Sequence, residues 1–194
     1  MNERGTIFTS DSVRAILAGR KTVTRRLVKL KPGETVEPVP DGDALVVWKD
    51  GASVRSPFPI GSTLWVKEAH APRYFDDGRP GYRADWTGAA ADVVPEPKWK
   101  SPLFMPRAIA RILLRVVSVR IEKLQDITEA DAKAEGVTPF PADPEGNCWT
   151  DGKYRTAYEY AWGELHGWEG EKWAMAPWQS NPWVRRIEFS VVTT

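Results

Sequence analysis

The chain has 194 residues, a formal net charge of +1 and 42% hydrophobic residues. This composition is typical of a globular protein and excludes a disordered chain, while the near-neutral charge excludes a global attraction to nucleic acid, so any such surface is local. Cys148 is the only cysteine and His70 and His166 are the only histidines, which argues against an internal disulfide, a zinc cluster or a multi-histidine metal site. The absence of a signal peptide or a long apolar run leads us to expect a cytoplasmic protein with no membrane contact.

The first predicted helix spans residues 10–18 and precedes a cluster of basic residues. Ser10 or Asp11 can cap its first turn, and Gly19 can end it. Its apolar residues fall on one face, which we expect to pack inward: Val13, Ile16 and Leu17. The segment that follows is rich in cations and hydroxyls: Arg20, Lys21, Thr22, Thr24, Arg25 and Arg26. Such a pattern suits a site for an anionic or polar ligand, and a solvated basic strand is the alternative interpretation.

Strands dominate much of the remaining chain. The residues between 31 and 42 are rich in proline, glycine and charge, which predicts a loop. Glu68 shares a strand face with Leu64 and Val66, where a carboxylate needs a partner. Alternation and β-branched residues predict strands at 6–9, 22–28, 44–48, 63–69, 108–123 and 183–192. The arginines of the longest strand do not share a parity, which predicts a β-bulge near residues 114–118.

Two further helices are predicted in the C-terminal half. Thr128 and Asp131 form a capping box at the start of the first, which Gly136 ends. The second spans 152–167, with Tyr154, Tyr158, Trp162 and Leu165 along one side. Together the elements predict an α+β fold with a curled β-barrel and a few flanking helices.

We expect one domain over residues 1–194, with long insertions near 71–107 and 138–180. The first insertion has little regular pattern, and its aromatic residues are expected to anchor it on the domain: Tyr74, Phe75, Tyr82, Trp86 and Trp99.

The segment Gly19-Arg-Lys-Thr-Val-Thr-Arg25 resembles the signature of the ASCH domain, a member of the PUA-like superfamily. Residues 59–68, 124–136 and 181–189 are similar to three further segments of that family, with Ser62 where an acid is common. The longer chain is similar to the prophage-associated branch. The resemblance implies a PUA-like curled β-barrel.

The same resemblance implies a function connected with RNA. Short members of the family include an amidohydrolase that removes the acetyl group from N4-acetylcytidine, and the positions that match its site are Lys21, Thr24 and Glu135. Here Lys21 would be the activating base, Thr24 the nucleophile and Glu135 the proton relay. A regular strand places Lys21 and Thr24 on opposite faces, so the chain must bend between them, and Thr22 is a competing nucleophile.

These observations predict a metal-independent amidohydrolase site that needs no cofactor. Its partner would be a modified nucleoside or RNA, with no DNA predicted and no expectation about protein partners. A non-catalytic RNA-binding module and a ribonuclease are the alternatives. The candidate substrate-binding residues are Arg20, Thr22, Arg26, Trp65, Glu68, Tyr82 and Arg107.

Overall fold

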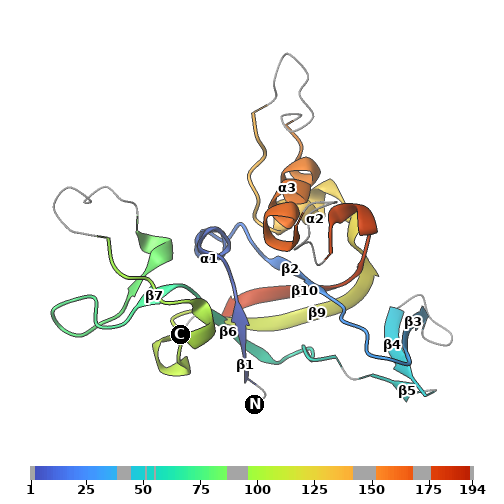
Figure 1. The fold of residues 1–194 in the computed structure, drawn as a ribbon, viewed down its shortest axis with the longest axis horizontal. Coiled ribbons are helices and arrows are strands. Elements are labelled where there is room, and N and C mark those ends of the chain that lie inside the picture. Colours follow the sequence, from blue (N-terminus) through green and yellow to red (C-terminus); the bar gives the residue numbers. More distant parts are fainter. Residues whose placement is uncertain are drawn as a thin grey trace.

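A five-stranded curled sheet forms the centre of the computed structural model (Figure 1). The structure describes residues 3–38, 45–50, 52–54, 56–86, 96–141, 152–167 and 176–192. In spatial order the strands are β1 (Glu3–Ile7), β6 (Thr63–Lys67), β9 (Leu113–Lys123), β10 (Trp183–Val192) and β2 (Val23–Leu27). Only β1 and β6 pair in parallel; the other neighbours are antiparallel.

This arrangement confirms the α+β class. The described strands do not close into a barrel, however, because β1 and β2 lie at opposite edges of the sheet. The predicted strand at 183–192 matches β10, whereas the strand predicted at 6–9 begins three residues earlier in the structure and ends at Ile7.

The predicted β-bulge lies in β9. Glu188 faces Ser118 and Phe189 faces Val116, so Val117 is the extra residue. The strand begins only at Leu113, because residues Arg107–Ile109 form a 3₁₀ turn. The bulge rotates the alternation of side chains along β9, which explains why its arginines do not share one parity.

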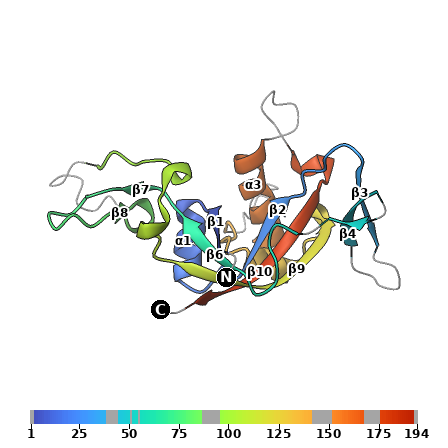
Figure 2. The ribbon, with the colours of Figure 1, turned by 90° about the horizontal axis from the view of Figure 1, so that it is seen from below.

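Two smaller sheets flank the central one at opposite ends (Figure 2). One contains β3 (Glu34–Pro38), β4 (Leu45–Lys49) and β5 (Ala52–Ser53). The expectation that 44–48 belongs to the central sheet was therefore wrong, because β4 pairs with β3 and β5 instead. The loop predicted at 31–42 was also wrong, because β3 lies within that range. The other small sheet pairs β7 (His70–Ala71) with β8 (Gly81–Tyr82).

Three α-helices accompany the sheets in the described part of the chain: α1 (Ser10–Leu17), α2 (Glu129–Ala134) and α3 (Tyr154–His166). Thr9 caps α1 in place of the predicted Ser10 or Asp11, because its hydroxyl accepts the Ser12 N–H. Thr128 caps α2 by accepting the Asp131 N–H, as the capping box predicts. The remaining helical segments are 3₁₀ turns at Arg83–Asp85, Pro102–Phe104, Arg107–Ile109, Leu124–Asp126 and Trp178–Ser180.

The core has two clusters. The first joins α1 to the sheet and includes Val13, Ile16, Leu64 and Ile187. Leu17 was expected there but is 53% exposed, because α1 turns it away from the buried face. The second cluster lies under α2 and α3 and is built around these residues: Leu124, Ala132, Tyr158, Trp162, Trp178 and Val184.

The first predicted insertion packs through its own aromatic rings. Tyr74 contacts Phe75 and Trp86 edge-on, and Trp86 contacts Trp99 in the same way. Glu68, at its base, has the partner that its buried position required, the guanidinium of Arg111. We call residues 70–86 and 96–107 the arm. Cys148 lies outside the described residues, as do residues 142–151 and 168–175 of the 138–180 insertion. Among the residues that the structure describes, no helix is long and apolar enough to cross a membrane.

Candidate functional site

Lys21 lies in the turn between α1 and β2. Gly19 follows the end of the helix with a φ of 70°, and the Lys21 N–H donates a hydrogen bond back to the Ala15 carbonyl of α1. The Thr22 N–H donates to the carbonyl of Ala134, at the end of α2. Because the regular strand starts only at Val23, the chain bends between Lys21 and Thr24, and both side chains line one pocket. Thr22, in contrast, is exposed and is not among the residues that line it.

Lys21 and Glu135 form a buried ion pair. Their atoms Nζ and Oε2 lie 2.6 Å apart, and the two side chains are 5% and 4% exposed. The same Nζ donates to the backbone carbonyl of Glu135 at 2.8 Å. The close approach depends on Gly136, where a Cβ would lie 2.7 Å from the Cβ of Lys21 and 2.7 Å from that of Ala15.

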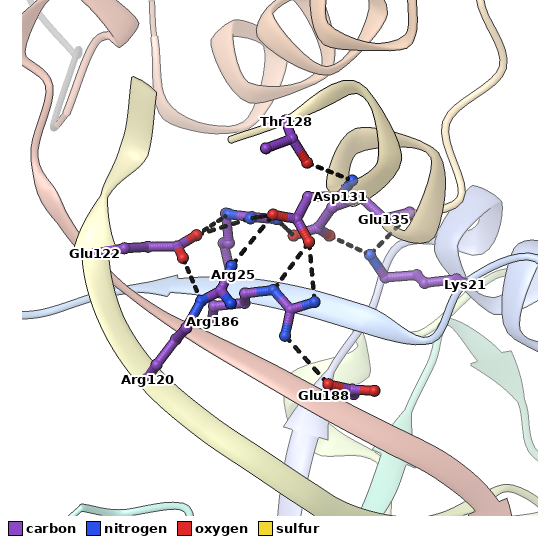
Figure 3. A network of polar contacts seen from close by, with 9 residues as sticks. All are labelled: Lys21, Arg25, Arg120, Glu122, Thr128, Asp131, Glu135, Arg186 and Glu188. Carbon is purple, nitrogen blue, oxygen red and sulfur yellow. Dashed lines mark hydrogen bonds and ion pairs between the residues drawn. The ribbon is translucent and has the colours of Figure 1, made fainter. Parts of the chain in front are cut away.

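The Glu135 carboxylate has a second cationic partner. Arg25, whose side chain is 0% exposed, places Nη1 3.1 Å from Oε1 of Glu135. Arg25 also contacts Glu122 of β9 and Asp131 of α2 (Figure 3). The site therefore belongs to a larger array of four cations and four carboxylates: Lys21, Arg25, Arg120, Arg186, Glu122, Asp131, Glu135 and Glu188.

Burial lowers the pKa of the Lys21 ammonium below that of a free lysine. The carboxylate of Glu135 opposes this shift, while Arg26 and Arg25 reinforce it as nearby cations. Burial also raises the pKa of the Tyr158 phenol well above its ordinary value, so that ring stays protonated and neutral. Burial thus disfavours the charged forms of both Lys21 and Tyr158, by lowering the pKa of the first and raising that of the second.

The pocket has a volume of about 210 Å³ and an aromatic wall. Tyr158 and Trp162 supply that wall from α3, and the His166 ring packs against Trp162 at a tilt of 32°, with ring centroids 4.0 Å apart. A second cavity of about 640 Å³ adjoins the first, since Thr9, Ser12, Glu135, Val137, Ala161 and Leu165 line both.

The structure brings some of the predicted binding residues to this place and not others. Arg26 lines the first cavity, and Arg20 lines the second while donating to the Gly136 carbonyl. The rest have partners elsewhere. Trp65 carries the Lys67 ammonium over its ring, Glu68 pairs with Arg111, Tyr82 donates to the Ile109 carbonyl, and Arg107 pairs with Glu3.

Sequence reasoning missed several residues of the site. Tyr158 and Trp162 were predicted only to share one side of a helix; their spacing of four residues is the signal that could have placed them together in the wall. Glu122 and Asp131 gave no such signal, because their contact with Arg25 depends on how α2 packs on the sheet. Among the described residues no group of three or more histidine, cysteine or carboxylate side chains is arranged to hold a metal ion.

Comparison with known proteins gives one structural likeness. No family model and no curated protein matches the chain. Among solved structures it is similar to the ASCH domain from Lactobacillus crispatus JV V101, at 13% sequence identity, over 98% of this chain and 79% of that one, with a TM-score of 0.39.

Proposed function

We propose that the Lys21 pocket hydrolyses a small acyl amide on a modified nucleoside, with N4-acetylcytidine as the leading candidate. The observation that carries this proposal is the buried Lys21–Glu135 ion pair in the same aromatic-walled cavity as the Thr24 side chain. The proposal also draws on the resemblance of Gly19 to Arg25 to the ASCH signature.

The proposed reaction has two stages. The Thr24 hydroxyl attacks the acetyl carbonyl carbon, and its proton passes to the neutral amine of Lys21. The C–N4 bond then breaks, the Lys21–Glu135 pair returns that proton to the leaving nitrogen, and cytidine departs. Water next attacks the threonine ester, releasing acetate and restoring the hydroxyl. The Lys21 ammonium of the ion pair must lose its proton before the first step, and burial supports this role because it lowers the pKa of Lys21.

The walls suit a flat ring with a polar edge. Tyr158 and Trp162 offer aromatic surface for stacking, and Arg26 lines the same cavity as a hydrogen-bond donor. The small volume fits a nucleoside base better than an extended strand, and the adjoining cavity leaves room for its sugar. We propose a free nucleoside or a nucleoside within RNA as the partner, bound by a single domain.

The decisive experiment follows release of cytidine from N4-acetylcytidine by the intact protein and by Lys21→Ala. We expect turnover in the intact protein, its loss in Lys21→Ala, and retention of cytidine binding measured by calorimetry. Lys31→Ala is the matched control, because Lys31 is an exposed lysine that lines neither cavity.

Other outcomes identify other functions. An intact protein without turnover, whose RNA affinity falls in Lys21→Ala and declines steeply with salt, would instead be an RNA-binding module. Cleavage of unmodified RNA would identify a ribonuclease.

A further inference from the structure

The Glu135 carboxylate divides its two oxygens between two cations. Oε2 receives the Lys21 ammonium at 2.6 Å, and Oε1 receives Nη1 of Arg25 at 3.1 Å. A carboxylate held on one oxygen can rotate about its last torsion, whereas one held on both cannot. The contact with Arg25 therefore fixes the direction in which Glu135 meets Lys21.

Arg25 is itself held from two further sides. Its Nε donates to Oε1 of Glu122 at 2.8 Å, and its Nη2 lies 3.2 Å from Oδ2 of Asp131. Asp131 is in turn bound by Arg186 through two hydrogen bonds, at 3.1 and 2.9 Å. One planar guanidinium thus joins β2 to β9, to α2 and to the residue that follows α2 (Figure 3).

We propose that Arg25 is a positioning residue of the Lys21 pocket, which acts through Glu135 by fixing its carboxylate and sharing its charge. This inference rests on the proposed function, in which Lys21 and Glu135 carry the proton. It assigns Arg25 no contact with the reacting atoms.

Sharing of the Glu135 charge has a consequence for Lys21. Without Arg25, the whole carboxylate charge would act on the ammonium and hold its proton more tightly. The charged and titratable groups around Lys21 come from three places, namely the end of α2, β2 and α3: Glu135, Arg25, Arg26, Tyr158 and His166. Of these, Arg25 is the cation bonded directly to the carboxylate that pairs with Lys21.

The test removes Arg25 while keeping the buried array neutral. The double variant Arg25→Met/Glu122→Gln deletes one charge of each sign, since an unpaired buried carboxylate would by itself destabilise the fold. We expect the pH midpoint of the Lys21 amine, followed by side-chain NMR of lysine-labelled protein, to rise by about one unit. The rising limb of the kcat/KM profile on N4-acetylcytidine should move to higher pH with it.

Two companion variants complete the test. Arg120→Gln is the matched control, because Arg120 contacts Glu122 and Asp131 but not Glu135, and it should leave the midpoint unchanged. Arg25→Lys keeps the cation without the planar fork, so we expect a smaller shift of the midpoint and a lower kcat. This variant carries the test if the double variant does not fold.

An unchanged Lys21 midpoint in folded protein without Arg25 would overturn the positioning role. An equal shift in Arg120→Gln would do so as well, because the effect would then belong to the array as a whole. The NMR midpoint does not depend on turnover. Failure of the amidohydrolase proposal, seen as an inactive intact protein, is therefore distinguishable from failure of this inference.

Discussion

Thr24 and Thr22 differ in their surroundings although they are two residues apart. Thr24 is buried and lines the pocket, whereas Thr22 precedes the regular strand and is exposed. Strand alternation alone places both on one face, so the sequence left the choice of nucleophile open. In the structure the two differ because the backbone N–H of Thr22 donates to the Ala134 carbonyl at the end of α2, before the regular strand begins at Val23.

We therefore predict that Thr24→Ala lowers turnover of N4-acetylcytidine by about 100-fold or more, because the reaction loses its attacking hydroxyl. Thr22→Ala is the control and should stay within about twofold of the intact protein, since rates change little away from the reacting atoms. Thr24→Ser, which keeps a hydroxyl, should restore part of the activity. Steady-state kinetics on the four proteins checks the prediction, and full activity in Thr24→Ala would remove Thr24 from the mechanism.

At the scale of elements, the site depends on how closely α2 approaches the turn after α1. Gly136 makes this approach possible: its φ is +82°, and a Cβ there would meet those of Ala15 and Lys21. Gly19 has a similar φ of +70° but nothing within 4 Å of the same position. Substitutions at these two glycines therefore distinguish the cost of backbone strain, which both positions share, from the cost of close packing, which only Gly136 has.

Gly136→Ala should lower the free energy of unfolding by more than Gly19→Ala. Both variants carry a left-handed strain of about 1–2 kcal/mol, but only Gly136→Ala must also push α2 away from Lys21. Turnover by the folded fraction should fall in Gly136→Ala and persist in Gly19→Ala. Thermal denaturation and kinetics measure the two effects, and equal losses of stability and turnover in both variants would contradict the packing argument.

Local signals predicted several elements well. The capping box at Thr128, the strand at 183–192 and the bulge in β9 each follow from residues close together in the chain. β3 was missed because proline, glycine and charge mask its alternation. The pocket membership of Lys21, Thr24 and Glu135 was predictable from a motif, whereas the positions of Trp65 and Arg107 depend on long-range packing that periodicity does not encode.

At the scale of the whole molecule, the pocket and the arm are held by separate charge clusters. The pocket uses the Arg25 array, while the arm is fastened by Arg111, which binds both Glu68 and Asp85 and lies over the ring of Tyr82. Arg111 lines neither of the two cavities. We therefore expect changes at Arg111 to affect stability without altering the chemistry of the pocket.

Variants of Arg111 and Arg107, which both pair with carboxylates near the arm, test whether the stability of the arm is independent of turnover in the pocket. Arg111→Met leaves Glu68, which is 1% exposed, without its bidentate partner, at a cost of about 3 kcal/mol and a decrease in Tm of roughly 6–12 °C. Arg107→Met breaks an exposed pair with Glu3 and should cost less than about 1 kcal/mol. Adding Glu68→Gln to Arg111→Met should recover part of the loss, because it removes the unpaired buried charge.

Calorimetry gives the Tm values, and kinetics below the transition should show unchanged turnover in all three variants. Similar Tm losses in Arg111→Met and Arg107→Met would mean that burial of Glu68 does not set the strength of this attachment, and lost turnover in folded Arg111→Met would mean that the arm and the pocket are coupled.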